Sequence, residues 1–240
     1  MTLIEYLLLL VLPVVSGLLA IRSSKSIEGM QKFLIALSGA FLFGITILDL
    51  SPQVFQFDGK WVVIFVLLGF LLQVFSEYFS KGIEHGHVHA EHGASLLWPV
   101  MIGLSIHSLI EGIPLSGSAD TSSIMHESLF WAILLHKLPA AFALGTLIAA
   151  TGRKQIFAFL ILIAFAFLTP LSGLLTHLFI QKEVSRFVNA LPYILAMVTG
   201  SFLHISTTLM FESGSRSHHF NLLKLLAILL GFFAASLIIL

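Results

Sequence analysis

The sequence contains no cysteine among its 240 residues. Disulfide bonds are therefore excluded, and so is any metal site built on thiolate ligands. The same absence leaves no cysteine pattern that would indicate a redox compartment. Histidine, by contrast, is frequent: eleven histidines stand against twelve Lys and Arg. This ratio is the first indication of metal or proton chemistry.

Charged residues are also scarce. They make up 10% of the chain, with 12 Lys+Arg and 12 Asp+Glu, whereas 58% of the residues are hydrophobic and the mean hydropathy is +1.02. A soluble domain of this size has to cover its surface with polar groups, so this composition indicates that lipid surrounds most of the protein. The net charge of zero gives no indication of a nucleic acid partner.

Apolar runs long enough to cross a bilayer, about 20 residues each, recur along the whole chain. We predict eight spans, at residues 3–21, 33–51, 61–79, 97–117, 127–150, 155–179, 188–210 and 221–240. Such long apolar runs satisfy their backbone groups only as helices, and the polar segments between them are too short for a soluble domain. The sequence therefore predicts an all-α integral membrane protein with one polytopic transmembrane domain over residues 1–240.

Lysine and arginine are distributed unevenly over the predicted loops. The odd-numbered loops and their flanks carry eight of these residues and the even-numbered loops carry three. Positive residues favour the cytoplasmic side, so we expect the odd loops to be cytoplasmic and both termini to lie outside the cytoplasm.

The third of these loops, at 80–95, is rich in histidine. It contains His85, His87, His89 and His92. Neutral imidazoles in such a loop can bind a divalent ion weakly. A solvated linker of biased composition explains the same residues equally well.

Ionisable side chains near the middle of a span carry the strongest functional signal. His107 and Glu111 are four residues apart in the fourth span and share one helix face, and His136 and Lys137 lie in the fifth span. A charge at bilayer depth costs roughly 2.5–3.5 kcal/mol on insertion scales. We therefore expect these four side chains to face one another.

Three interpretations of this cluster remain open. A structural salt bridge between Glu111 and Lys137 explains two residues and leaves two histidines without a role. A proton relay would also use His and Glu. A metal site explains most of the cluster, because His107, Glu111 and His136 form a ligand set suited to zinc and other first-row divalent ions. Pro114 and Pro139 lie within a turn of these residues and free carbonyls there.

Other polar residues are weaker candidates for supporting the site or lining a pathway. Asp49, Glu77 and Glu212 lie near span ends, where snorkelling or capping explains them as well as a transport role does. Ser108 and His204 complete this set.

The motifs resemble those of the ZIP family of metal transporters. HSLIEG and HKLPAAFALG resemble the paired fourth- and fifth-helix motifs of that family, and weaker likenesses lie at residues 49–53, 169–173 and 200–204. The resemblance implies inverted three-helix repeats around the fourth and fifth helices. It also implies that His107, Glu111 and His136 bind the metal.

The function implied by this resemblance is import of a divalent metal ion into the cytoplasm. The metal would be the transported substrate, Zn²⁺ or else Fe²⁺, Mn²⁺, Co²⁺ or Cd²⁺, and no cofactor is expected. The family also suggests a homodimer, and the small size and short loops suggest a bacterial inner (plasma) membrane.

Departures from the family pattern narrow these expectations. Lys137 and Ala140 stand where many members place ligands of a second metal, so we predict that the ammonium of Lys137 substitutes for the second cation and that one metal binds. Leu209 and His204 replace an acidic residue and a tyrosine that are frequent in the family. A membrane metal-binding regulator without transport activity stays open as an alternative. An intramembrane metal-dependent hydrolase also stays open, although the chain has no HExxH motif.

Overall fold

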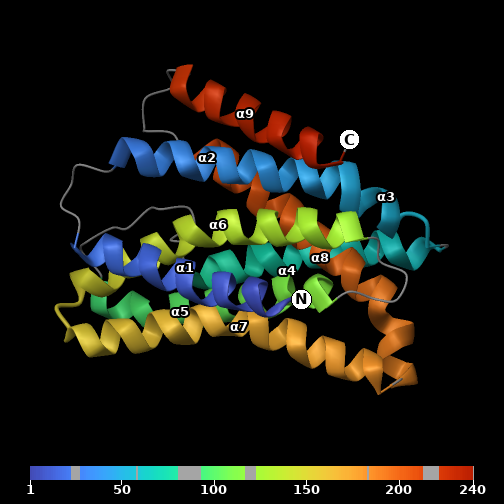
Figure 1. Cartoon of the computed structure of the whole chain (residues 1–240), viewed down its shortest axis with the longest axis horizontal. Coiled ribbons are helices and arrows are strands. Elements are labelled where there is room, and N and C mark those ends of the chain that lie inside the picture. The colour runs from blue at the N-terminus through green and yellow to red at the C-terminus, as the bar shows by residue number, and fades with distance from the viewer. Residues whose placement is uncertain are drawn as a thin grey trace.

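The computed structural model describes residues 1–22, 28–57, 59–80, 93–116, 123–182, 184–212 and 222–239. Within these ranges the chain is helical and contains no strand. Figure 1 shows long helices lying side by side, with the N- and C-termini toward the same end of the bundle.

The helices follow the apolar runs of the sequence. Their bounds are α1 Leu3–Arg22, α2 Glu28–Ile45, α3 Ser51–Val54, α4 Lys60–Ser80, α5 Gly93–Gly112, α6 Ser123–Ala150, α7 Gln155–Gln181, α8 Ser185–Glu212 and α9 Leu222–Ile239. A π-helical segment, Thr46–Leu50, joins α2 to α3, and a 3₁₀ turn, Ile113–Ser116, follows α5. In the described part of the chain, eight segments are long and apolar enough to cross a membrane, which confirms the predicted number.

The second span is longer than we predicted. It runs over Gly29–Val54, whereas the hydropathy pattern predicted 33–51 and a loop from Ser51 onward. Pro52 lies at the start of α3, directly after the π-helical segment, and the backbone stays helical through it. The π-helical segment before it adds an extra residue to the turn and reorients the side chains there.

Helix packing follows an internal symmetry. The helix α4 packs along α8 as α9 packs along α2, and α1 packs along α6 as α7 packs along α5. Exchanging α1 with α7, α2 with α8, α4 with α9 and α5 with α6 maps each pairing onto its counterpart. An inverted three-helix repeat around two central helices requires such a pattern.

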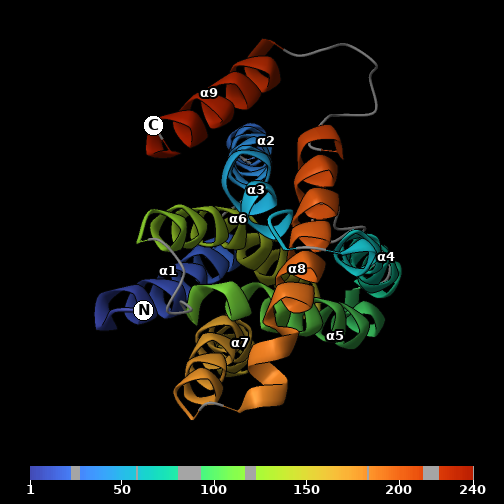
Figure 2. The ribbon, with the colours of Figure 1, turned by 90° about the vertical axis from the view of Figure 1, so that its right-hand side faces the viewer.

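These pairings divide the bundle into two groups of four helices. One group contains α1, α5, α6 and α7, and the other contains α2, α4, α8 and α9. In Figure 2 the first group lies in the lower half and α9 and α2 lie above it, with α6 near the centre. The α6 span is the most buried of the eight.

Glycines allow the closest helix approaches. A Cβ atom built on Gly69 of α4 would lie 1.9 Å from the carbonyl oxygen of Met197 in α8, and one on Gly200 would lie equally close to the carbonyl of Val66. Small residues at such crossings let two backbones touch, which is how helices associate within lipid.

We expect the Gly69→Ala variant to be less stable than the wild type by about 1–3 kcal/mol, because the added methyl group must push two backbones apart. Its apparent melting temperature in detergent measures this loss. Gly29→Ala is the matched control, because nothing lies within 4 Å of a Cβ at that exposed position. Equal melting temperatures for the two variants would contradict the close approach of α4 and α8.

Candidate metal centre

Two antiparallel helices supply the candidate site. The fourth span, α5, carries His107, Ser108 and Glu111, and α6 carries His136 and Lys137 near its middle. All five side chains are buried, with exposed fractions between 0 and 4%.

Both helices contain a proline close to these residues. After Gly112 the fourth span tightens into the 3₁₀ turn that contains Pro114, whereas Pro139 lies inside α6 and the helix continues past it. The hydroxyl of Ser16 in α1 donates to the carbonyl of Leu138, at 2.8 Å. The carbonyl that Pro139 leaves without its helical donor is that of Leu135, one turn earlier, so this contact ties α1 to α6 beside the proline but does not replace the lost bond.

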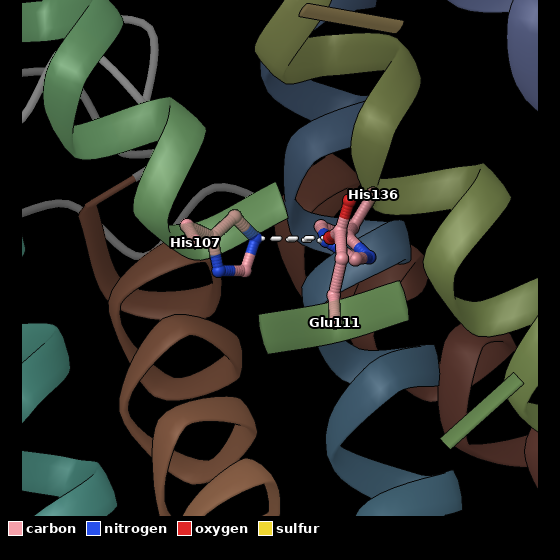
Figure 3. A group of neighbouring side chains, drawn as sticks. All are labelled: His107, Glu111 and His136. Atoms are coloured by element: carbon pink, nitrogen blue, oxygen red, sulfur yellow. Dashed lines mark hydrogen bonds and ion pairs between the residues drawn. The ribbon is translucent and has the colours of Figure 1, made fainter. Parts of the chain in front are cut away.

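Three potential ligand atoms converge between the helices, as Figure 3 shows. The Nε2 atom of His107 lies 3.1 Å from Oε2 of Glu111, and Nε2 of His136 lies 2.9 Å from the same oxygen. The two Nε2 atoms are 3.3 Å apart. A tetrahedral zinc ion with bonds of about 2.0–2.1 Å separates its ligands by about 3.3–3.4 Å. The three atoms therefore form nearly one face of such a tetrahedron.

The tautomer of His136 is fixed by its second nitrogen. Its Nδ1 lies 2.9 Å from the carbonyl oxygen of Ala132, one turn earlier in α6. A carbonyl only accepts hydrogen bonds, so Nδ1 carries the proton and the lone pair of Nε2 in a neutral ring points at Glu111. In that state two acceptor atoms face each other at 2.9 Å, a spacing that either a shared proton or a bound metal ion satisfies. A backbone partner of this kind is the usual support of a metal-binding histidine.

His107 is held less firmly. Its Nδ1 is buried and has no hydrogen-bond partner among the described residues. The ring is therefore oriented through Nε2, which lies beside Glu111 and His136.

The second oxygen of Glu111 is already occupied. Its Oε1 atom lies 2.5 Å from Nζ of Lys137 and accepts a short hydrogen bond from the hydroxyl of Thr169 in α7. The ammonium also donates to Ser108 Oγ at 2.9 Å and to Thr169 Oγ1 at 2.6 Å, so its three protons each have an acceptor. The ring of Phe165 covers the ammonium, with its centroid 4.3 Å from Nζ. One carboxylate is thus shared between the ammonium of Lys137 and the two imidazole nitrogens of His107 and His136.

Asp49 lies elsewhere in the bundle. It sits in the π-helical segment, is 9% exposed, accepts a hydrogen bond from Gln53 at 2.8 Å and accepts a short one from Ser128 in α6. Snorkelling to the membrane surface therefore does not explain it. Ser128 precedes His136 by two helical turns, about 12 Å along the helix axis. Asp49 thus lies toward the side on which α6 begins.

Glu77 and His204 form a pair on the opposite side. The Nε2 atom of His204 in α8 lies 2.6 Å from Oε2 of Glu77 in α4, and the ring packs against Phe70. One turn further into the membrane, the hydroxyl of Ser201 donates to Gln73 at 3.1 Å. A polar seam therefore runs between α4 and α8 and does not reach the three converging ligand atoms directly.

Some predicted residues lie outside the described part of the chain. They are the side chain of Glu212 and the loop residues His85, His87, His89 and His92.

Sequence reasoning missed several polar contacts. It did not identify Thr169 as a neighbour of Glu111 and Lys137, because threonine in an apolar helix is commonplace. It also missed the pair between Glu5 of α1 and His126 of α6, whose Nε2 lies 3.1 Å from both carboxylate oxygens. The position of Thr169 directly before Pro170, in the segment that resembles the family, was the only available signal.

Ala140 and Leu209, which depart from the family pattern, pack as apolar residues. Ala140 lies against a hydrophobic cluster that includes Leu144 and Phe165, and Leu209 is 2% exposed beside Gly39. Neither position brings another ligand to the three converging atoms.

Comparison with known proteins gives the family. A model of the ZIP zinc transporter family matches residues 84–239, which include all the residues around the candidate site. Zinc transporter ZIP9-B of Xenopus laevis is 29% identical over 165 residues, which cover 66% of this chain and 54% of that protein. Protein zntD of Dictyostelium discoideum is 30% identical over 167 residues, covering 63% of this chain and 24% of that protein.

A plant zinc transporter is similar to this chain to about the same degree. Zinc transporter 1 of Oryza sativa subsp. japonica is 29% identical over 142 residues, covering 55% of this chain and 39% of that protein. The chain spans about half the length, or less, of these curated relatives. Since the family model matches more than half of the chain, this protein belongs to the ZIP zinc transporter family.

Proposed function

We propose that this protein carries divalent metal ions, zinc foremost, across a membrane through the site between α5 and α6. The observation that supports this most strongly is the convergence of His107 Nε2, Glu111 Oε2 and His136 Nε2 within a buried part of the spans. Relatives named as zinc transporters favour zinc and favour transport over hydrolysis. Fe²⁺, Mn²⁺, Co²⁺ and Cd²⁺ suit the same ligands and are the ions to compete against zinc.

The ligand set is suited to exchange. Three protein ligands leave a fourth position for water or a carbonyl, as in open zinc sites. An ion can then lose its water in steps and leave again when the site opens to the other side. A closed cage of four protein ligands would release its ion more slowly.

The site is proposed to hold one ion. Oε1 of Glu111 faces the ammonium of Lys137, at 2.5 Å, so this oxygen already has a cation beside it. A second divalent ion at this position would have to displace a buried ammonium with three hydrogen-bond partners.

The proposed direction of transport is into the cytoplasm, with both termini outside and the chain acting as one domain in a bacterial plasma membrane. The uneven distribution of Lys and Arg supports this orientation. Asp49 would then lie on the outer side of the site, and Glu77 and His204 on the cytoplasmic side, toward the histidine-rich loop. Assembly as a homodimer is part of the same proposal.

Zinc uptake into sealed proteoliposomes tests the proposed function. We expect the wild type to import zinc and the His107→Ala variant to do so no faster than empty vesicles. His177→Ala is the matched control, because His177 lies on α7 about 12 Å along the helix axis from Thr169, and it should import like the wild type. Zinc uptake by His107→Ala at the wild-type rate would contradict the proposed site, and zinc binding without uptake by the wild type would favour a regulator.

The Glu77→Gln variant should transport more slowly and bind zinc with unchanged affinity. The pair with His204 does not touch the three ligand atoms, but an intramembrane carboxylate on the cytoplasmic side attracts a leaving cation. The maximal uptake rate and the zinc dissociation constant, measured separately, check this prediction. Tyr78→Phe, at the neighbouring exposed position, serves as the control. A several-fold loss of zinc affinity in Glu77→Gln would contradict the prediction.

A further inference from the structure

Thr169 lies between the two charges of the site without touching either histidine. It is fully buried in α7, and its hydroxyl contacts Oε1 of Glu111, Nζ of Lys137 at 2.6 Å and the carbonyl oxygen of Ser108 at 3.1 Å. A hydroxyl offers one proton and two lone pairs. The ammonium takes one lone pair, and the single hydroxyl proton is left for the carboxylate or the carbonyl. The hydrogen-bonding capacity of this side chain is thus used almost entirely on the site.

The backbone around Thr169 fixes the position of this hydroxyl. A Cβ on Gly112 of α5 would lie 2.3 Å from the carbonyl oxygen of Thr169, so the two helices are in direct contact at this level. Three residues further along α7, the hydroxyl of Ser172 donates to the carbonyl of Leu109 at 2.5 Å. Two hydroxyls of α7 therefore bind the carbonyls of two consecutive residues of α5, and only one of them also reaches the charged groups.

The consequence concerns the orientation of Glu111. Thr169 and Lys137 hold Oε1 from one side, which leaves Oε2 as the oxygen that faces His107 and His136. Without the hydroxyl, the carboxylate can rotate about its terminal torsion, which has only broad minima. The ammonium also loses one of its three acceptors and gains freedom to move toward the metal position.

We propose that Thr169 is a positioning residue. Its hydroxyl directs Oε2 of Glu111 toward the metal and keeps the ammonium of Lys137 beside Oε1. This inference depends on the proposed metal site. In this proposal α7 contributes to metal affinity by orienting the carboxylate of Glu111, although the metal ligands themselves lie on α5 and α6.

The test is zinc affinity measured by titration calorimetry on the purified full-length protein in detergent. We expect Thr169→Val, which keeps the shape and removes the hydroxyl, to weaken zinc binding by about 10- to 100-fold, the usual cost of losing such a supporting hydrogen bond. Thr169→Ser keeps the hydroxyl and should bind zinc nearly as the wild type does.

Ser172→Ala is the matched control. It removes the other hydroxyl bridge between α7 and α5 and leaves Glu111 and Lys137 untouched. A purely structural role of Thr169 would lower the melting temperature of the zinc-free protein in both variants and weaken zinc binding in neither. Wild-type affinity in Thr169→Val, or equal weakening in Ser172→Ala, would overturn the proposal.

A variant that fails to fold does not end the test. Thr169→Ala removes the same hydroxyl with a smaller side chain, and it should weaken zinc binding about as much as Thr169→Val does. Failure of the metal site itself gives a different result: the wild type would then bind no zinc, or His107→Ala would bind it as well as the wild type.

Discussion

The Glu111→Gln variant is expected to lose zinc uptake completely and to unfold more easily than the wild type. Glutamine has the same shape but cannot supply the anionic oxygen that faces both histidines at 2.9 and 3.1 Å. It also leaves the ammonium of Lys137 buried without a counter-charge, and breaking a buried ion pair on one side costs about 3–5 kcal/mol. Uptake into proteoliposomes and the apparent melting temperature in detergent measure the two effects.

A double variant separates the two roles of this carboxylate. Glu111→Gln combined with Lys137→Met removes both charges, so much of the lost stability should return, since exchanging a whole buried ion pair for uncharged groups is often neutral. Zinc uptake should stay absent, because the ligand is still missing. Glu127→Gln, at an exposed position of α6, controls for the loss of a carboxylate as such. Restored uptake in the double variant would contradict the role of Glu111 as a ligand.

Replacing Lys137 alone should have the opposite effect on metal binding. The ammonium lies next to the carboxylate that holds the metal, and it repels a divalent ion by several kcal/mol even at an effective dielectric constant of about 20. Lys137→Met is therefore expected to bind zinc at least about tenfold more tightly, a gain of about 1.4 kcal/mol. Transport should become slower, because a tightly bound ion leaves slowly.

The same substitution should also destabilise the protein without metal. The buried carboxylate of Glu111 then lacks the ammonium that balances its charge. Because zinc supplies a positive charge instead, saturating zinc should raise the melting temperature of Lys137→Met by more than that of the wild type. Calorimetric titration with and without prior chelation gives both quantities. Lys224→Met is the control, because that lysine binds the carbonyl of Phe211 far from the site in the fold. Unchanged or weaker zinc binding in Lys137→Met would refute the idea that the ammonium competes with the metal.

The sequence was sufficient to predict the number of spans and the meeting of four ionisable side chains. Hydropathy alone predicts eight helices, because an apolar run of this length has no other stable backbone arrangement in lipid. The cost of burying charge then requires His107, Glu111, His136 and Lys137 to meet, and the carboxylate of Glu111 contacts each of the other three. Both predictions depend on free energies of several kcal/mol, for unpaired backbone groups in lipid and for buried charges, and effects of that size can be predicted from the sequence.

Structural details that depend on smaller free-energy differences were not predictable from the sequence. Whether the second span ends at Ser51 or at Val54 depends on a π-helical turn and one proline, and no periodic pattern indicates either. The contacts of Thr169 and Ser128 depend on how α7 and α2 sit against the central helices. Hydroxyls of this kind occur throughout membrane helices, so only the packed structure distinguishes those that reach a charged group.

The most direct test of the proposed site is the metal content and zinc-edge X-ray absorption spectrum of the purified protein after equilibration with zinc. We expect one zinc ion per chain, coordinated by two imidazole nitrogens with oxygen ligands completing the shell, and we expect this signal to vanish in His136→Ala. Two zinc ions per chain in the wild type, or a His136→Ala variant that keeps the same spectrum, would contradict a single ion held between His107, Glu111 and His136.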